Sequence, residues 1–242
     1  MDWPRARISF IVPAYNEEKE LPATLSQLRS AAEESRCDDY EIVVANDAST
    51  DRTAAIAREF GARVIELNRR QIAAARNSGA RAANGDVLIF VDADTHIRGA
   101  HVQGAVDALS SGCAGGGAPL EFDREVPFWA KLFFAAFTTI YFRFLRLGTG
   151  GFLFTSRRNF NHIGGFNEKY FAAEEFFFTL ALRRIGHFKL LQCPAKTSGR
   201  KLRLYSGGKL LRQLLLIAVC GPRAVTSRRN LDLWYGGERE RS

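Results

Sequence analysis

Residues Asp86 to Thr95 read DVLIFVDADT, an apolar run that ends in two aspartates one residue apart. The apolar part is typical of a buried strand, and the aspartates follow at its carboxyl end. Alternate residues at a strand end project to the same side, so we expect both carboxylates to face one point. Two neighbouring carboxylates repel each other unless a cation lies between them, and a divalent ion would suit them. The alternative is a strand-to-loop turn with two solvated acids.

The chain before this stretch alternates between apolar strands and helices. Strands are predicted at residues 7–13, 40–47, 63–67 and 86–94. The helices predicted between them cover residues 21–34, 49–62 and 70–85, with Ser49 or Thr50 as the cap of the second. Strands that are apolar throughout and separated by helices indicate a mostly parallel sheet with both faces covered. Ligands of such sheets bind beyond the carboxyl ends of the strands, where the clusters PAYNE, NDAST, NRR and DADT lie.

The second half has a less regular pattern. A glycine-rich stretch leads into a strand near residue 120, and residues 148–170 read as strand, short helix and turn. A helix is predicted at residues 172–186, followed by a strand, a basic loop and a final apolar helix. We therefore divide the chain into a core domain at residues 1–205, with halves 1–97 and 98–205, and an extension at 206–242. The extension is expected to hold an apolar or amphipathic helix and a basic tail.

The amino-acid composition limits the kinds of partner that the protein is expected to bind. The net charge of +8 and the pI near 9.6 favour an anionic partner, such as nucleic acid, anionic lipid or a phosphorylated small molecule. No nucleic-acid-binding motif is present, so we expect no nucleic acid. The four cysteines lie far apart, which favours reduced thiols in the cytoplasm over disulfides or a zinc site. The first ten residues lack the apolar segment of a signal peptide, and no run reaches the ~18 apolar residues of a membrane-spanning helix.

Four segments occur in an order that resembles glycosyltransferase family 2. They are SFIVPAYNEEKELPATLSQL, EIVVANDASTDRTAAIA, AAARNSGARAANGDVLIFVDADT and GGFNEKYFAAEEFFFTLALRRIG. Members of this family are inverting nucleotide-sugar transferases with the GT-A fold, and the resemblance covers about residues 7–205. It implies an α/β fold, a mostly parallel central sheet flanked by helices, and transfer of a sugar from a nucleotide-diphosphate sugar to a hydroxyl. A UDP-sugar is favoured and a GDP-sugar is possible. The QxxRW motif of processive members is absent, so we expect one sugar per acceptor.

The resemblance assigns the nucleotide site to the first two strand ends. Pro13, Ala14 and Tyr15 would line the base, and Glu17 would reach the base or the ribose. Asp47 falls on the position that accepts a hydrogen bond from the nucleobase. The alternatives are an ordinary strand end for the first group and, for Asp47, a cap on the next helix.

The resemblance also makes VDADT the metal site of the family. Asp92 would lie near the ribose, and Asp94 would coordinate Mg²⁺ or Mn²⁺ on the donor's diphosphate. Hard carboxylate oxygens suit these ions, which share their remaining positions with water and phosphate. Arg76 would contact the nucleotide or pair with an acid at the sheet end, and the alternative is an exposed helical salt bridge. Asn46 replaces the family's usual acid, so its role stays open.

An inverting transfer needs a carboxylate that deprotonates the acceptor hydroxyl. The family usually has Glu-Asp at this point, with the aspartate as base, and this chain has Glu174 and Glu175. Glu175 takes the base position by alignment, and Glu174 is the second candidate. A helix N-terminus would favour their ionised form, and the alternative is two ordinary first-turn acids. Arg200 and Lys201, with Arg203, would close over the diphosphate or form a solvated face.

Two apolar segments flanked by basic residues, at 127–148 and 209–229, suggest contact with a membrane surface. We expect the protein in the cytoplasm, peripheral on the inner face of a membrane, with a lipid-linked acceptor and a role in envelope polysaccharide or glycolipid synthesis. The segments would otherwise pack on the core or in a homodimer. The rival functions are an inactive nucleotide-sugar-binding or scaffold protein and a nucleotidyltransferase. The latter would carry a glycine-rich phosphate loop, which VPAYNEE lacks. A dehydrogenase is a poor fit, because no GxGxxG follows the first strand.

Overall fold

The computed structural model describes residues 6–122, 150–199, 225–227 and 231. Within these residues, a seven-stranded sheet has the order β3-β2-β1-β4-β8-β6-β9. Its strands are β1 (Ile8–Ala14), β2 (Tyr40–Asp47), β3 (Arg63–Leu67), β4 (Val87–Val91), β8 (Phe152–Ser156), β6 (Gly115–Gly117) and β9 (Phe188–Leu190). Strands β3, β2, β1 and β4 are parallel, β8 runs antiparallel to β4 and β6, and β6 is parallel to β9. The expected α/β fold with a mostly parallel sheet is confirmed.

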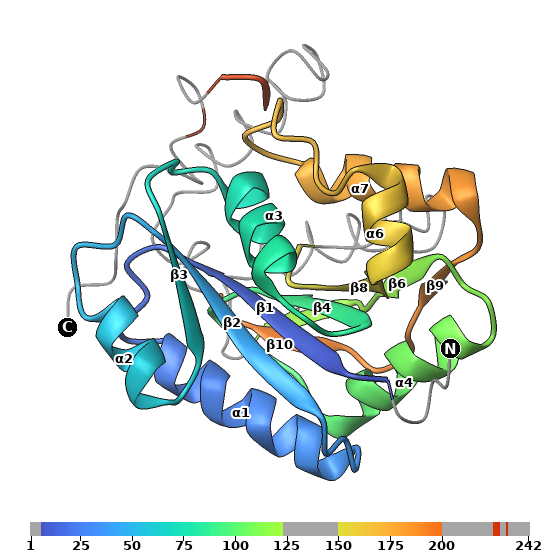
Figure 1. Ribbon diagram of the computed structural model, residues 1–242, viewed down its shortest axis with the longest axis horizontal. Coiled ribbons are helices and arrows are strands. Elements are labelled where there is room, and N and C mark those ends of the chain that lie inside the picture. Colours follow the sequence, from blue (N-terminus) through green and yellow to red (C-terminus); the bar gives the residue numbers. More distant parts are fainter. Residues whose placement is uncertain (1–5, 123–149, 200–224, 228–230, 232–242) are drawn as a thin grey trace.

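Helices cover both faces of this sheet (Figure 1). One face carries α1 (Leu21–Glu34), α2 (Thr53–Glu59) and α4 (Gly99–Ser110), and the other carries α3 (Ile72–Ala82), α6 (Arg157–Ile163) and α7 (Glu174–Ile185). Every residue of β1 and β4 is buried, which explains why their sequences are apolar throughout rather than alternating.

Two apolar clusters hold these layers together. One lies between the sheet and the α1 and α4 helices, and the second lies between the sheet and the α3, α6 and α7 helices. In the second cluster the Phe90 ring contacts the rings of Phe160, Phe166 and Phe178 at centroid distances of 5.8, 5.0 and 5.9 Å. The start of α7 is thereby packed over the strand that leads to Asp92.

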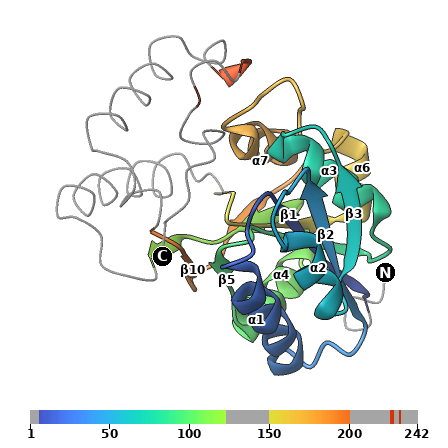
Figure 2. The same cartoon turned by 90° about the vertical axis from the view of Figure 1, so that its left-hand side faces the viewer.

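A second, smaller sheet begins just after β4 in the chain. It has the order β5-β10-β7, formed by β5 (Thr95–His96), β10 (Ala195–Thr197) and β7 (Leu120–Phe122). Figure 2 labels two of its strands, β5 and β10. The strand predicted at 86–94 ends at Val91, because the Thr95 N–H bonds to the Asp92 carbonyl at 3.0 Å and closes a turn. Asp92 and Asp94 therefore lie on a turn, and the expectation that they extend the strand is wrong.

The second helix also begins later than predicted. It starts at Thr53, and neither Ser49 nor Thr50 caps it. The Asp51 carboxylate instead accepts the Thr53 N–H at 3.0 Å, and the Ser49 hydroxyl accepts the Asn16 N–H at 2.9 Å. Short polar side chains in this loop thus bond the first strand end to the second, which competes with helix capping.

Several predictions fall outside the described residues. They are the aromatic segment, the final apolar helix, Arg200, Lys201, Arg203 and most of the extension at 206–242. Of that extension, Val225 and Leu231 are buried against Ala172, and the Phe171 N–H bonds to the Val225 carbonyl at 2.7 Å. In the part of the chain that the structure describes, no helix combines the length and the apolar character needed to span a bilayer.

Candidate active site

The first strand end carries an aromatic ring beside a guanidinium. The Arg70 guanidinium lies over the Tyr15 ring, 3.4 Å from its centroid. Pro13 and Ala14 are buried in the last positions of β1, and the Glu17 N–H bonds to the Thr53 hydroxyl at 2.8 Å. The predicted nucleotide loop is therefore fixed against the start of α2, with one aromatic face beside a cation.

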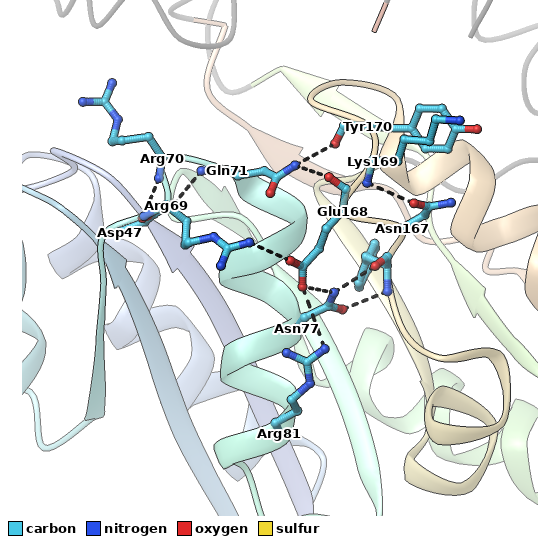
Figure 3. Close-up of polar contacts among 11 residues, drawn as sticks. Asp47, Arg69, Arg70, Gln71, Asn77, Arg81, Asn167, Glu168, Lys169 and Tyr170 are labelled. Carbon is cyan, nitrogen blue, oxygen red and sulfur yellow. Dashed lines mark hydrogen bonds and ion pairs between the residues drawn. The ribbon is translucent and has the colours of Figure 1, made fainter. Parts of the chain in front are cut away.

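Asp47 orders the segment that leads into α3. Its carboxylate accepts the backbone N–H groups of Arg69, Arg70 and Gln71 at 2.7, 2.8 and 2.6 Å (Figure 3). Asp47 is buried, and it does not cap α2, so the alternative offered for this residue is wrong. Its contact with a nucleobase stays a prediction. The segment it holds bears Arg70, whose backbone is left-handed with φ of 50°.

Arg76 joins the two acidic regions of the site. Its guanidinium donates to Glu174 at 2.5 Å, to Asp92 at 2.8 Å and to the Gly150 carbonyl at 3.0 Å. Its side chain is 1% exposed, compared with 4% for Glu174 and 29% for Asp92. The prediction that Arg76 pairs with an acid at the sheet end is confirmed, and the exposed helical salt bridge is wrong. One buried cation links the end of β4 to the start of α7.

The charges around Arg76 change the pKa of the neighbouring groups. Burial by itself would lower the pKa of Arg76, but Asp92, Glu174 and Glu175 raise it above its usual range, so the guanidinium stays charged. Burial raises the pKa of Glu174, and the Arg76 guanidinium limits this rise. Partial burial and the adjacent Glu174 charge raise the pKa of Glu175 to about 8. Desolvation and the like charge of Glu174 therefore act against the ionised form of Glu175, which the helix N-terminus would favour.

The turn with Asp92 and Asp94 is held from two sides. The Thr24 hydroxyl donates to the Ala93 carbonyl at 2.8 Å, and the Ser198 N–H donates to the Asp94 carbonyl at 3.1 Å. Two carboxylates on a fixed turn offer hard oxygen ligands, which suit Mg²⁺ or Mn²⁺. Within the described ranges, no group of three or more His, Cys, Asp or Glu residues is placed to hold a metal. The acids on this turn fit a cation that takes its other ligands from a substrate or from water.

The family model described as glycosyl transferase family 2 matches residues 9–183. The chain belongs to this family. A dolichyl-phosphate beta-glucosyltransferase from Trichomonas vaginalis is 42% identical over 103 residues, which cover 38% of this chain and 32% of the relative. The match thus spans about a third of that relative's length.

Solved structures show the same fold. The mannosyltransferase PcManGT from Pyrobaculum calidifontis, in complex with GDP-Man and Mn²⁺, has a TM-score of 0.64 and 21% identity over 89% of this chain and 62% of its own. TarS residues 1–349 from S. aureus, in complex with UDP-GlcNAc, have a TM-score of 0.63 and 18% identity over 89% of this chain and 67% of theirs. These likenesses confirm the GT-A fold.

Asn46, which replaces the usual acid of glycosyl transferase family 2, has a structural partner. Its side-chain amide donates to the Glu66 carboxylate at 2.6 Å, and Arg58 donates to the same carboxylate at 2.6 Å. An ionised aspartate at this position would face Glu66 without a proton to donate, and the two charges would repel each other. The amide at Asn46 therefore matches Glu66 on the neighbouring strand.

A polar cluster that the sequence analysis did not identify lies beside the site in this family member. Gln71, Asn77 and Glu168 bind the loop before α7 to the α3 helix (Figure 3). The Asn77–Glu168 partners are 91 residues apart in the chain, so no local pattern pairs them. The only available signal was the position of both residues inside the family-like segments.

Proposed function

We propose that the chain is a metal-dependent inverting glycosyltransferase that moves one sugar from a nucleotide-diphosphate sugar to a hydroxyl. The observation that carries this proposal is the bridge from Arg76 to both Asp92 and Glu174. It puts the acid at the end of β4, where ligands of such sheets bind, one guanidinium away from the acids that begin α7. Membership of glycosyl transferase family 2 gives this arrangement its reaction class.

The donor would bind across the ends of β1 and β2. Tyr15 offers a ring face for the base, Pro13, Ala14 and Glu17 border it, and Asp47 orders the segment on its other side. The two structural neighbours hold a uridine sugar and a guanosine sugar, which supports a nucleotide-diphosphate sugar as donor. A UDP-sugar is proposed first and a GDP-sugar second, as the family resemblance implies.

Asp94, with Asp92 beside it, would hold the Mg²⁺ or Mn²⁺. When bound, the cation would neutralise the charge that develops on the departing nucleoside diphosphate. Arg76 orients Asp92, because its guanidinium donates to that carboxylate at 2.8 Å. Mn²⁺ in the structure of the P. calidifontis mannosyltransferase supports a divalent ion.

Glu175 would act as the general base. Its carboxylate takes the proton of the acceptor hydroxyl while that oxygen bonds to the anomeric carbon and the bond to the diphosphate oxygen breaks. A pKa near 8 suits this role, because a base works best when its pKa is close to the working pH. Glu174 is less suited, because its carboxylate is already paired with Arg76.

The acceptor would be lipid-linked. The T. vaginalis relative carries a dolichyl-phosphate acceptor in its name, and a net charge of +8 favours an anionic membrane surface. We therefore propose peripheral contact with a membrane.

The donor site can be tested by thermal unfolding with a panel of nucleotide diphosphates and nucleotide sugars, with and without Mn²⁺. A ligand present at a hundredfold excess over its dissociation constant stabilises the fold by about 2.7 kcal/mol. We expect a metal-dependent shift with one nucleotide, lost in Asp94→Ala and kept in Asp107→Ala, which removes an exposed acid on α4. A panel without any shift would overturn the donor site. A shift without sugar transfer would favour the inactive nucleotide-sugar-binding protein.

A further inference from the structure

Glu168 lies in the loop between α6 and α7 and points its carboxylate back onto α3 (Figure 3). One carboxylate oxygen accepts the Asn77 side-chain amide at 2.9 Å, and the other accepts the Arg69 guanidinium at 3.3 Å. Arg81 lies further away at 3.8 Å, with 64% of its side chain exposed. The carboxylate of Glu168 thus accepts from two different parts of the chain at once.

Backbone groups of the same loop are bonded to α3 as well. The Gln71 side-chain amide donates to the Glu168 carbonyl at 2.5 Å and to the Tyr170 carbonyl at 3.4 Å. Asn77 exchanges two bonds with the Phe166 backbone, each 2.8 Å long. Gln71 and Asn77 are 5% and 1% exposed, so these bonds are shielded from water. Shielded bonds to a loop restrict it more than exposed ones do.

This network meets the segment that Asp47 holds. Arg69 and Gln71 each donate a backbone N–H to Asp47, and each donates a side-chain N–H to Glu168. A continuous set of bonds therefore runs from the end of β2 to the loop that enters α7. The first residue of that helix is Glu174, four residues after Tyr170.

We propose that Glu168 is a positioning residue that fixes the start of α7, and with it Glu175, relative to the Asp47-bound segment. The proposal rests on the proposed function, because it assigns Glu175 as the base and the segment to the nucleotide. A catalytic group must be held within about 0.5 Å of its productive position, and a displacement of about 1 Å costs up to ~10²-fold in rate. Glu168 does not need to touch either substrate to act in this way.

The carboxylate at this position is specific. Asn77 and Arg69 both present N–H donors, and only a group that accepts on both oxygens satisfies them together. A glutamine has the same shape but turns one N–H₂ group toward one of these donors. Glu168→Gln therefore weakens the bridge with almost no change in volume. Arg81→Ala is the matched control, because Arg81 and Arg69 are similarly exposed, at 64% and 62%, and Arg81 is the more distant of the two.

Two readouts test the proposal on the full chain at a temperature where every variant is folded. The first is hydrogen exchange of the backbone amides at residues 176–180, without ligand. We expect Glu168→Gln to speed exchange there at least about tenfold, with Arg81→Ala unchanged. Unchanged exchange in Glu168→Gln would overturn the proposal whether or not the protein transfers sugar.

The second readout separates kcat from donor binding. We expect Glu168→Gln to lower kcat about tenfold while the donor Kd stays within about twofold, since the bridge orients the base and not the nucleotide. A weaker donor Kd with unchanged kcat would overturn the proposal, because Glu168 would then act on the donor site and not on the base. An altered exchange pattern with normal kcat would overturn the link to the reaction. Absence of transfer by the wild type would refute the proposed function, and the exchange result would still decide whether Glu168 fixes α7.

Discussion

At the scale of the residue, the protonation of Glu175 sets the expected pH dependence. Partial burial and the Glu174 charge raise its pKa to about 8, well above the pKa of an ordinary carboxyl group. A general base acts only when ionised. We therefore predict that kcat/KM rises about tenfold per pH unit below this pKa and levels off above it. A profile of kcat/KM between pH 5.5 and 9.5 checks this, and a flat profile would contradict it.

The raised pKa of Glu175 also makes the stability of the fold depend on pH. The unfolded chain has an ordinary carboxyl pKa near 4.3, so the folded protein holds this proton more tightly. The stability linked to the bound proton is complete below the unfolded value and is lost as pH rises through about 8. Replacement by glutamine removes this loss. Thermal unfolding should therefore show that Glu175→Gln gains stability over the wild type at pH 9 relative to pH 5.

The buried ion pair between Arg76 and Glu174 predicts a large loss of stability when the Arg76 side chain is replaced. Arg76→Met leaves the Glu174 carboxylate, only 4% exposed, without its cation, and breaking such a pair costs about 3–5 kcal/mol. Urea unfolding measures the difference. Arg52→Ala is the control, because the Arg52 and Glu59 side chains are 69% and 57% exposed and such surface pairs contribute at most about 1 kcal/mol. If Arg76→Met and Arg52→Ala lowered the free energy of unfolding equally, burial would not explain the strength of the Arg76–Glu174 pair.

At the scale of the element, β6 depends on its lack of side chains. A Cβ built on Gly116 would overlap the Lys189 carbonyl oxygen and the Phe154 ring, which come from the two neighbouring strands. Overpacking of this kind costs about 1–3 kcal/mol, so Gly116→Ala should lower the free energy of unfolding by at least that amount. In Gly104→Ala the new Cβ meets only the flexible Leu191 side chain, at 3.0 Å. The helix propensity of alanine offsets that contact, so we expect a change near zero.

How well each element can be predicted depends on whether its interactions are local in the sequence or join distant parts of the chain. The bounds of β2 and β3, at 40–47 and 63–67, follow from local apolar runs and agree with the sequence-based prediction. Local patterns missed the turn at Asp92 and the role of Asp51, because competing side-chain and backbone bonds decide both. They also missed Glu168, whose partners come from distant parts of the chain. The proposed roles of Asp92, Asp94 and Glu175 rest on the family resemblance, and the raised pKa of Glu175 follows only from the packed structure.

At the scale of the whole molecule, the charge of +8 predicts binding to anionic membranes. Sedimentation with vesicles that contain phosphatidylglycerol should exceed that with neutral vesicles, and it should fall as salt rises because screening shortens the reach of the charges. Arg143 and Arg146 lie near the end of the apolar segment at 127–148, and their replacement by serine should weaken binding. Equal binding to neutral vesicles would argue against the electrostatic contact, and no binding to either would argue against a membrane-bound acceptor.

The central claim is that Glu175 deprotonates the acceptor while other residues bind the donor. The most direct test measures sugar transfer and donor Kd side by side in the wild type and in Glu175→Gln. The account predicts that transfer falls at least ~10²-fold and that donor Kd stays within about twofold, since a general base contributes about 10²–10⁴-fold to the rate and Glu175 is assigned to the acceptor. Transfer near the wild-type rate in Glu175→Gln would contradict the assignment of the base and the mechanism built on it.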